Sequence, residues 1–156
     1  MNIAEKDFFK KKKVLVTGGS GFIGSNLSIR LVELGADVTV IDNMNSDTGS
    51  NLQNLDGCKE KIKFFDIDLS KTSNSELKLI GKMDVIFHLA GLTSHAGSMV
   101  DPKGDLYGNV VSTINTLNFI TDRCRDSKLV FTSTRQLYGK PQYLPVDESH
   151  PINPPD

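Results

Sequence analysis

Residues 17–24 read TGGSGFIG and follow directly on the apolar run Val14–Val16, which is typical of a buried strand. A strand, a glycine-rich turn and the start of a helix, in this order, form the phosphate cradle of a dinucleotide-binding unit. Gly18 permits the tight turn, the missing Cβ of Gly21 lets a pyrophosphate approach the backbone, and Gly24 lets helix and strand pack closely. The helix N-terminus then presents free N–H groups and a positive dipole to the anion.

The rest of the chain alternates short apolar β-branched runs with longer helical stretches. We expect strands at Val14–Thr17, Val38–Ile41, Ile62–Phe65, Val85–Phe87 and Leu129–Phe131. We expect helices at Phe22–Leu34, Glu76–Ile80 and Asp105–Arg123, with loops at Asn43–Gly57 and Leu92–Met99. This pattern predicts an α/β fold, a doubly wound, Rossmann-like parallel sheet with strand order 3-2-1-4-5. The sheet is expected to be incomplete, with its last strand at an edge that a further segment would cover.

The bulk composition is that of one globular domain. The chain has 156 residues, of which 38% are hydrophobic and 24% charged, and its net charge is −1. This charge gives no reason to expect nucleic acid or an acidic membrane as partner. Residues 1–12, which include most of the run Lys10–Lys13, are interpreted as a solvated basic leader to a domain at 13–156.

The two cysteines and three histidines show no metal-ligand spacing, so no metal site is predicted. No apolar stretch approaches the roughly 20 residues of a membrane helix. No signal peptide is apparent either, and the cytoplasm is the expected compartment.

An acidic residue lies where a dinucleotide site needs one. Asp42 follows the second expected strand, and an acid there binds the hydroxyls of the adenosine ribose. No arginine lies between Asp42 and Lys63 to receive a 2′-phosphate. The cofactor predicted is therefore NAD rather than NADP.

Five segments, in order, resemble the extended short-chain dehydrogenases/reductases, especially the NAD-dependent nucleotide-sugar epimerases and dehydratases. They are Thr17–Gly24, Asp66-Ile67, His88–Gly91, Asn109-Val110 with Thr113, and Ser133-Thr134 followed by Leu137–Gly139. The resemblance implies a nucleotide-sugar substrate and an NAD site made of Gly18, Gly21, Phe22, Ile23, Gly24, Asp42, Asn43, Asp66, Ile67, Leu89, Ala90, Gly91 and Asn109. It also implies a homodimer, by analogy alone.

The resemblance makes Thr134 the expected catalytic contact to the sugar hydroxyl that is oxidised; the alternative is a local backbone bond. His88 is interpreted as a structural histidine and His95 as a weaker candidate for the substrate loop. Arg135-Gln136 stands where the sugar 4,6-dehydratases have an Asp-Glu pair. Arginine stays protonated and glutamine does not titrate, which favours 4-epimerisation through a transient keto sugar.

The family's Tyr-x-x-x-Lys pair, which the resemblance makes the catalytic base and its partner, is not found. Tyr107, Tyr138 and Tyr143 are followed four residues later by valine, glutamine and aspartate. We therefore expect a chain truncated in the proline-rich loop before that pair, without the substrate domain. Two other functions stay open: a reductase of the same superfamily acting on a non-sugar ketone, and a non-catalytic NAD-binding regulatory module.

Overall fold

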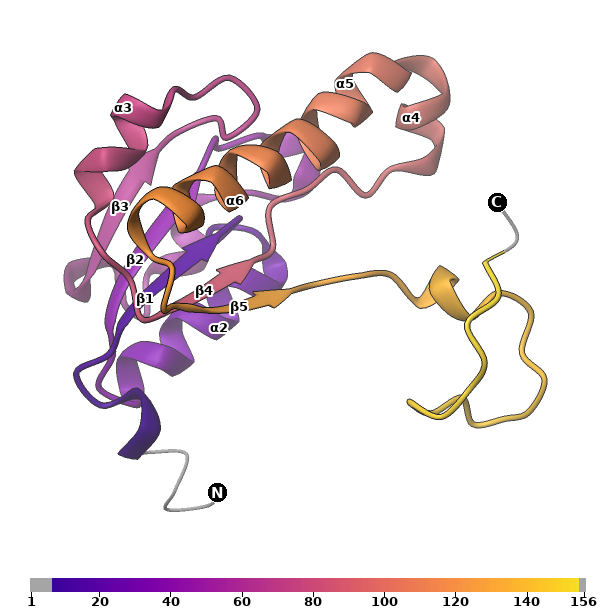
Figure 1. Ribbon diagram of the computed structural model, residues 1–156, viewed down its shortest axis with the longest axis horizontal. Helices are drawn as coiled ribbons and strands as arrows, with labels where there is room; N and C mark the ends of the chain where they lie inside the picture. The colour runs from indigo at the N-terminus through magenta and orange to yellow at the C-terminus, as the bar shows by residue number, and fades with distance from the viewer. Residues whose placement is uncertain (1–6, 155–156) are drawn as a thin grey trace.

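The computed structural model describes residues 7–154, which form one parallel sheet with helices on both faces (Figure 1). The strands are β1 (Lys13–Thr17), β2 (Asp37–Asp42), β3 (Ile62–Asp66), β4 (Val85–His88) and β5 (Lys128–Phe131). They lie in the order β3-β2-β1-β4-β5 and all pair in parallel, which confirms the predicted doubly wound sheet. At the carboxyl edge of the sheet, Thr17 pairs with Ile41 on one side and His88 on the other.

The helices complete the two outer layers. The α-helices are α2 (Phe22–Glu33), α3 (Asn74–Leu77), α4 (His95–Val100), α5 (Pro102–Leu106) and α6 (Ser112–Arg123). Short turns of 3₁₀-helix are η1 (Ser46–Thr48), η2 (Leu52–Leu55), η3 (Lys59–Lys61), η4 (Lys78–Ile80) and η6 (Arg135–Tyr138), and η5 (Tyr107–Val111) is a π-helical turn. None of the helices in residues 7–154 is long and apolar enough to cross a membrane.

Alternation along β1 divides the core between the two faces of the sheet. Val14 and Val16 pack on one face with Leu31 of α2, whereas Leu15 packs on the other with Phe119 of α6. Successive side chains of a strand point to opposite faces, so a strand covered on both sides is apolar at every position. The continuous apolar run that marked this strand in the sequence therefore has a direct structural cause.

The stretch Leu92–Met99, expected to be a loop, is helical from His95 onward as part of α4, so that prediction was wrong. Ser94 is its N-cap, and the Oγ of Ser94 accepts a hydrogen bond of 3.0 Å from the Gly97 N–H. A serine cap was readable from the sequence. The glycine in the first turn and the short helix length weakened the helical pattern.

The long helix expected at Asp105–Arg123 begins earlier and is not uniform. It starts at Pro102, and its N-cap Asp101 accepts a hydrogen bond of 2.9 Å from the Gly104 N–H. An aspartate followed by proline at the first helical position is a strong start signal. The π-helical turn η5 then interrupts the α-helical pattern between α5 and α6.

The basic stretch before β1 packs against the domain in its described part; residues 1–6 lie outside the described residues. The Phe9 ring contacts the Phe87 ring, with centroids 6.4 Å apart. The Lys11 N–H donates to the Gly35 carbonyl at 2.8 Å. The side chains of Lys10 and Lys11 are exposed, so the backbone and Phe9 make the contacts while the charges face solvent.

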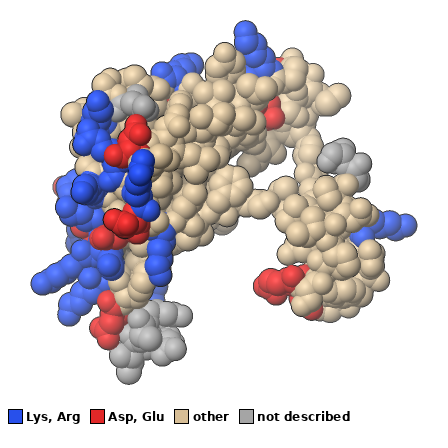
Figure 2. All heavy atoms as spheres, in the orientation of Figure 1, with Lys and Arg blue, Asp and Glu red and all other residues tan. Residues whose placement is uncertain are grey.

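Strand β5 lies at the edge of the sheet and is exposed along its whole length. The exposed fraction rises from 38% at Leu129 to 57% at Phe131. Figure 2 shows that charged side chains gather at the left of the molecule, whereas the surface over α6 and β5 is nearly free of charge. Residues 135–154 extend away from this edge (Figure 1).

A chain of buried hydrogen bonds joins β1 to the end of β4. The Oγ1 of Thr17 accepts the N–H groups of Leu89 and Ala90, each at 3.2 Å. The Thr17 hydroxyl therefore donates its own proton to the Nδ1 of His88, 2.9 Å away. His88 is 2% exposed, and its Nδ1 is the acceptor of this bond.

The same imidazole connects the sheet to α6. Because Nδ1 accepts, the proton of the neutral ring lies on Nε2, which donates to the Thr113 Oγ1 at 3.0 Å. The Thr113 hydroxyl in turn donates to the Asn109 carbonyl at 2.6 Å. His88 is thus a satisfied structural histidine, as the sequence predicted.

Burial lowers the pKa of His88 below the ordinary value of 6.5, which makes stability depend on pH. As the pH falls below about 6.5, the unfolded chain takes up a proton that the folded chain refuses. The contribution of His88 to the stability of the fold is therefore complete above this pH and declines below it.

We expect the free energy of unfolding, measured with urea from about pH 5 to about pH 8, to fall on the acid side. His88→Gln should flatten that fall, and His95→Gln, a control at an exposed histidine, should not. An equally steep fall in His88→Gln would contradict this assignment.

Candidate functional site

A cavity of about 1120 Å³ opens at the carboxyl ends of the strands. It spans the point where the strand order reverses, between β1 and β4, which is where ligands bind in open α/β sheets. Every residue that the sequence predicts to bind the cofactor lines it, except Asn109. These lining residues are Gly18, Gly21, Phe22, Ile23, Gly24, Asp42, Asn43, Asp66, Ile67, Leu89, Ala90 and Gly91.

Two of the three signature glycines are required by the fold itself. Gly18 has a φ of +67°, and a Cβ there would lie 2.8 Å from the backbone nitrogen of Ala90. A Cβ on Gly24 would overlap the carbonyl oxygen of Gly18. These two positions let α2 start directly against the end of β1.

Gly21 differs, because nothing in the described part of the chain requires it to be glycine. Its φ is −73°, which any residue adopts, and a Cβ would meet only the Gly18 oxygen at 3.4 Å. That contact is ordinary, yet the position lines the cavity. The missing side chain therefore leaves room for a ligand against the backbone, as a pyrophosphate would need.

The N-terminus of α2 is open to an anion. Among the described residues, no side chain caps it, and its first turn contains no acidic residue. The first intrahelical bond runs from the Ser25 N–H to the Gly21 carbonyl, so the N–H groups of Phe22, Ile23 and Gly24 lack intrahelical acceptors. The Phe22 and Ile23 side chains are exposed, which leaves this end of the helix accessible.

Asp42 is held at the end of β2, beside the glycine turn. It is 7% exposed and lines the cavity. Its Oδ2 accepts the Ser20 N–H at 3.0 Å, and its Oδ1 accepts the Met44 N–H at 3.0 Å and the Ser50 hydroxyl at 2.7 Å. A carboxylate with this many donors has a fixed orientation.

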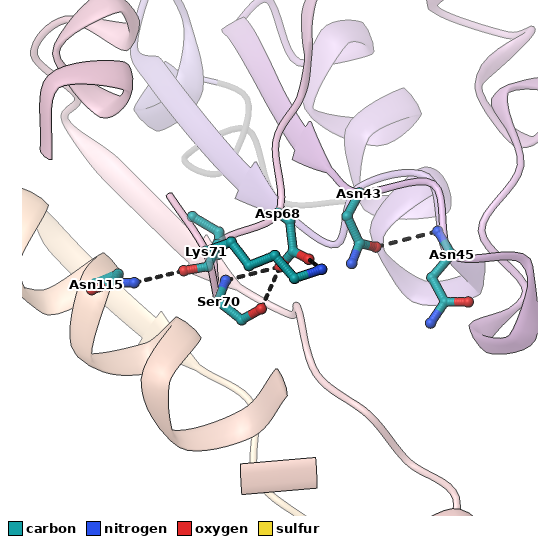
Figure 3. A network of polar contacts seen from close by, with 7 residues as sticks. Asn43, Asn45, Asp68, Ser70, Lys71 and Asn115 are labelled. Atoms are coloured by element: carbon teal, nitrogen blue, oxygen red, sulfur yellow. Dashed lines mark hydrogen bonds and ion pairs between the residues drawn. The ribbon is translucent and has the colours of Figure 1, made fainter. Parts of the chain in front are cut away.

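A polar rim that the sequence reasoning missed borders the cavity after β3 (Figure 3). Asp68 accepts the N–H and hydroxyl of Ser70 at 3.0 and 2.6 Å, and lies 2.9 Å from the Lys71 ammonium. Burial would raise the pKa of Asp68, but the hydrogen bonds from Ser70 and Lys71 and the charge of Lys71 hold it below its ordinary value. The spacing Asp-x-Ser, which favours such a side-chain turn, was the available signal.

Other contacts hold this rim in place. From α6, the Asn115 amide donates to the Leu69 carbonyl at 2.8 Å (Figure 3). On the β2 side, Asn43 accepts the Asn45 N–H at 3.2 Å. The Lys71 side chain is 81% exposed, so its ion pair contributes little to stability. The rim is ordered mainly by hydrogen bonds to the backbone.

Asn109 lies behind the cavity and fixes the loop after β4. Its Oδ1 accepts the Leu92 N–H at 2.8 Å, and its Nδ2 donates to the Leu92 carbonyl at 3.2 Å and to Asp105 at 3.1 Å. It belongs to the π-helical turn η5, a feature often found at functional sites. In this structure Asn109 therefore positions residues that line the cavity and does not line it itself.

Thr134 is exposed, and the cavity wall at this edge is formed by its neighbours Thr132 and Ser133. Its Oγ1 accepts the Gln136 N–H at 3.3 Å and caps η6, which is the local bond weighed as the alternative. Its hydroxyl proton is not used in that bond. His95 is brought to the same region, where its Nε2 lies 2.7 Å from the Gln136 Nε2.

Comparison with known proteins gives this arrangement a context. The sequence profile of the GDP-mannose 4,6 dehydratase family matches residues 15–156. The UDP-glucose 4-epimerase of Mus musculus is 35% identical over 150 residues, covering 90% of this chain and 42% of the relative. The epimerase Mth375 of Methanothermobacter thermautotrophicus superposes with a TM-score of 0.82 at 30% identity, covering 97% of this chain and 44% of that one.

A further solved relative carries ligands. The UDP-glucose 4-epimerase of Bifidobacterium longum, in complex with NAD⁺ and UDP, has a TM-score of 0.76 at 30% identity, covering 90% of this chain and 42% of that one. The present chain thus spans less than half of the length of the relatives it matches. The family match nevertheless extends over nearly all of its residues, from β1 to the C-terminus. The chain belongs to the GDP-mannose 4,6 dehydratase family, as its resemblance to the nucleotide-sugar epimerases and dehydratases predicted.

Proposed function

We propose that this chain binds NAD in the cavity at the carboxyl ends of the strands, as the cofactor-binding part of a nucleotide-sugar 4-epimerase. The proposal rests on two neighbouring features. Gly21 has no side chain although no contact among the described residues demands a glycine there, and the N-terminus of α2 beside it has no side-chain cap. An anion is the ligand that such a helix end favours. The Bifidobacterium longum relative that holds NAD⁺ supports the same assignment.

The chain's own groups divide the dinucleotide between them. The N–H groups of Phe22 and Ile23 would bind the pyrophosphate, and Asp42 would accept a hydroxyl of the adenosine ribose. The backbone from Leu89 to Gly91 would contact the rest of the dinucleotide, on the side of the cavity toward β5. NAD, when bound, would accept a hydride from a sugar carbon, and the proton of the hydroxyl group on that carbon would pass to a base, which the family resemblance makes the tyrosine of the Tyr-x-x-x-Lys pair. Thr134, whose hydroxyl proton is committed to no other described residue, would donate a hydrogen bond to the oxygen on that carbon.

The residues after Thr134 favour epimerisation within this family. Arg135 and Gln136 cannot exchange a proton at neutral pH, which the elimination of water requires. The Gln136 amide is instead paired with His95. Returning a hydride to the opposite face of a keto sugar needs no acid at these two positions. The relatives from Mus musculus and Bifidobacterium longum are named as UDP-glucose 4-epimerases, which supports this choice.

Two further assignments belong to the proposal. We assign the protein to the cytoplasm because Cys58 and Cys124 are buried free thiols, as is usual in a reducing compartment. We also propose a homodimer that forms through the helical surface from α5 to α6. On this surface Leu106, Val110 and Ile114 are each about half exposed, at a spacing of four residues. Exposed apolar side chains along one helical stripe are typical of a helix that packs against another.

Titration with NAD tests the cofactor site. By isothermal calorimetry, the unsubstituted chain should bind NAD and Gly21→Val should not, because the added side chain would enter the space left for the pyrophosphate. Thermal unfolding should show that Gly21→Val stays folded. Gly24→Ala is the contrasting variant, since its Cβ overlaps the Gly18 carbonyl and should disrupt the fold. Undiminished NAD binding by Gly21→Val would refute the site.

The choice between cofactors is a separate test. A 2′-phosphate would lie beside the Asp42 carboxylate, and two like charges at close range should weaken NADP relative to NAD by at least about tenfold. Asp42→Asn removes the charge and should bring the affinities for NAD and NADP closer together in calorimetric titrations. Equal affinities of the unsubstituted chain for NAD and NADP would show that Asp42 does not face the ribose.

Sedimentation velocity tests the homodimer. Ile114→Glu introduces a charge in the middle of the exposed apolar stripe and should shift the chain from dimer to monomer. Gln53→Glu, at an exposed position of η2, which packs with α2 on the opposite face of the sheet, should leave the dimer intact. A chain that sediments as a monomer without any substitution would exclude this interface.

A further inference from the structure

The hydrogen bonds around Asp42 have a direction that can be derived group by group. Asp42 can only accept when ionised, so the Ser50 hydroxyl must donate its single proton to the Oδ1, 2.7 Å away. Ser20 and Ser50 oxygens are 2.5 Å apart, and with the Ser50 proton committed, Ser20 must be the donor between them. The result is an ordered chain from Ser20 through Ser50 to the carboxylate.

The two serine hydroxyls of this hydrogen-bonded chain are buried. Ser20 is completely buried, and Ser50 is 7% exposed. The Met44 sulfur covers both hydroxyl oxygens, at 3.5 Å from Ser20 and 3.7 Å from Ser50. Met44 adopts a φ of +56°, a conformation that a non-glycine residue rarely takes, and its N–H donates to the same Oδ1 as Ser50. Buried hydrogen bonds of this kind stabilise one geometry because their alternatives leave groups unpaired.

Ser20 connects the glycine turn to the loop after β2 through every polar group it has. Its N–H donates to the Asp42 Oδ2, and its carbonyl accepts the Asn51 N–H at 3.2 Å and the Asn54 amide at 2.8 Å. Its hydroxyl donates to Ser50, in the loop that carries Asn51 and Asn54. The turn that would bind a pyrophosphate and the carboxylate that would bind a ribose are therefore parts of one hydrogen-bonded unit.

We propose that Ser50 is a positioning residue for the adenosine ribose: its buried hydroxyl holds the Asp42 carboxylate in the orientation that receives a ribose hydroxyl. This rests on the proposed NAD site. A carboxylate offers about two acceptor positions per oxygen. Met44 and Ser50 occupy both at Oδ1, whereas Ser20 occupies only one at Oδ2. The ribose hydroxyl is therefore received at Oδ2, and Ser50 acts by keeping Oδ1 turned away from the ligand.

The test compares NAD affinities of Ser50→Ala and the unsubstituted chain by calorimetry. Losing a hydrogen bond to a charged group should weaken NAD binding by about tenfold. Ser28→Ala is the matched control, because Ser28 is buried like Ser50 and its Oγ has no hydrogen-bond partner among the described residues. Ser28→Ala should bind NAD as tightly as the unsubstituted chain. Ser50→Thr, which keeps the hydroxyl, should recover affinity.

Deoxy analogues separate positioning from a general loss of structure. NAD analogues lacking the 2′- or the 3′-hydroxyl of the adenosine ribose should be titrated into the same proteins. For the analogue that lacks the hydroxyl received by Asp42, the loss caused by Ser50→Ala should shrink to less than about threefold. A role in folding alone would weaken all ligands equally. If Ser50→Ala does not fold, Ser20→Ala, which removes only the donor to Ser50, should show a smaller loss with the same dependence on the ribose hydroxyl.

The possible results are distinct. Unchanged NAD affinity in folded Ser50→Ala, or an equal loss for NAD and both analogues, would overturn the role of Ser50 and leave the NAD site standing. An unsubstituted chain that does not bind NAD would overturn the proposed function, and the role of Ser50 with it. A tenfold loss that depends on one ribose hydroxyl would establish the positioning role.

Discussion

The close contact between α2 and the end of β1 is the constraint on which the site depends. The first turn of α2 can lie against the end of β1 only because Gly24 has no Cβ to strike the Gly18 carbonyl, and Gly18 can turn only because positive φ is open to it. Together they bring the unpaired N–H groups of the first helical turn to the carboxyl edge of the sheet. Parallel pairing of β1 with β2 then places Asp42 next to that turn. The cavity follows from these two short-range effects.

The regular parts of the fold were predictable because burial imposes a period on the sequence. Val14, Leu15 and Val16 alternate between two covered faces, so the strand is apolar throughout and can be recognised. The helix α4 was not recognised, because it is short and contains Gly97, and its stability depends on a Ser94 cap more than on a buried face. The start at Pro102 was missed for a related reason. Caps act through single hydrogen bonds, which leave no repeating pattern.

The residues of the candidate site likewise divide into those that the sequence predicts and those that only the folded structure reveals. Residues whose backbone or position forms the cavity, such as Gly21 and Ala90, follow from the strand-turn-helix order and the family's motifs. Asn109 follows from the same motifs, but its side chain is bound to the Leu92 backbone and does not line the cavity. Ser50 had no signal at all, since a serine in a polar loop is ordinary. Its importance arises only when folding buries it against Asp42, eight residues earlier in the chain.

Family membership and reaction type are carried by different parts of this chain. The glycine turn, Asp42 and the loop after β4 would serve any reaction that passes a hydride to NAD, so they cannot distinguish an epimerase from a dehydratase. The distinction falls on Arg135 and Gln136, in a turn beyond the exposed edge strand and outside the cavity wall. A guanidinium that stays charged and an amide that does not titrate remove the proton transfer that elimination needs. A family named for 4,6-dehydration thus contains a chain whose side chains after β5 support the epimerisation that we propose.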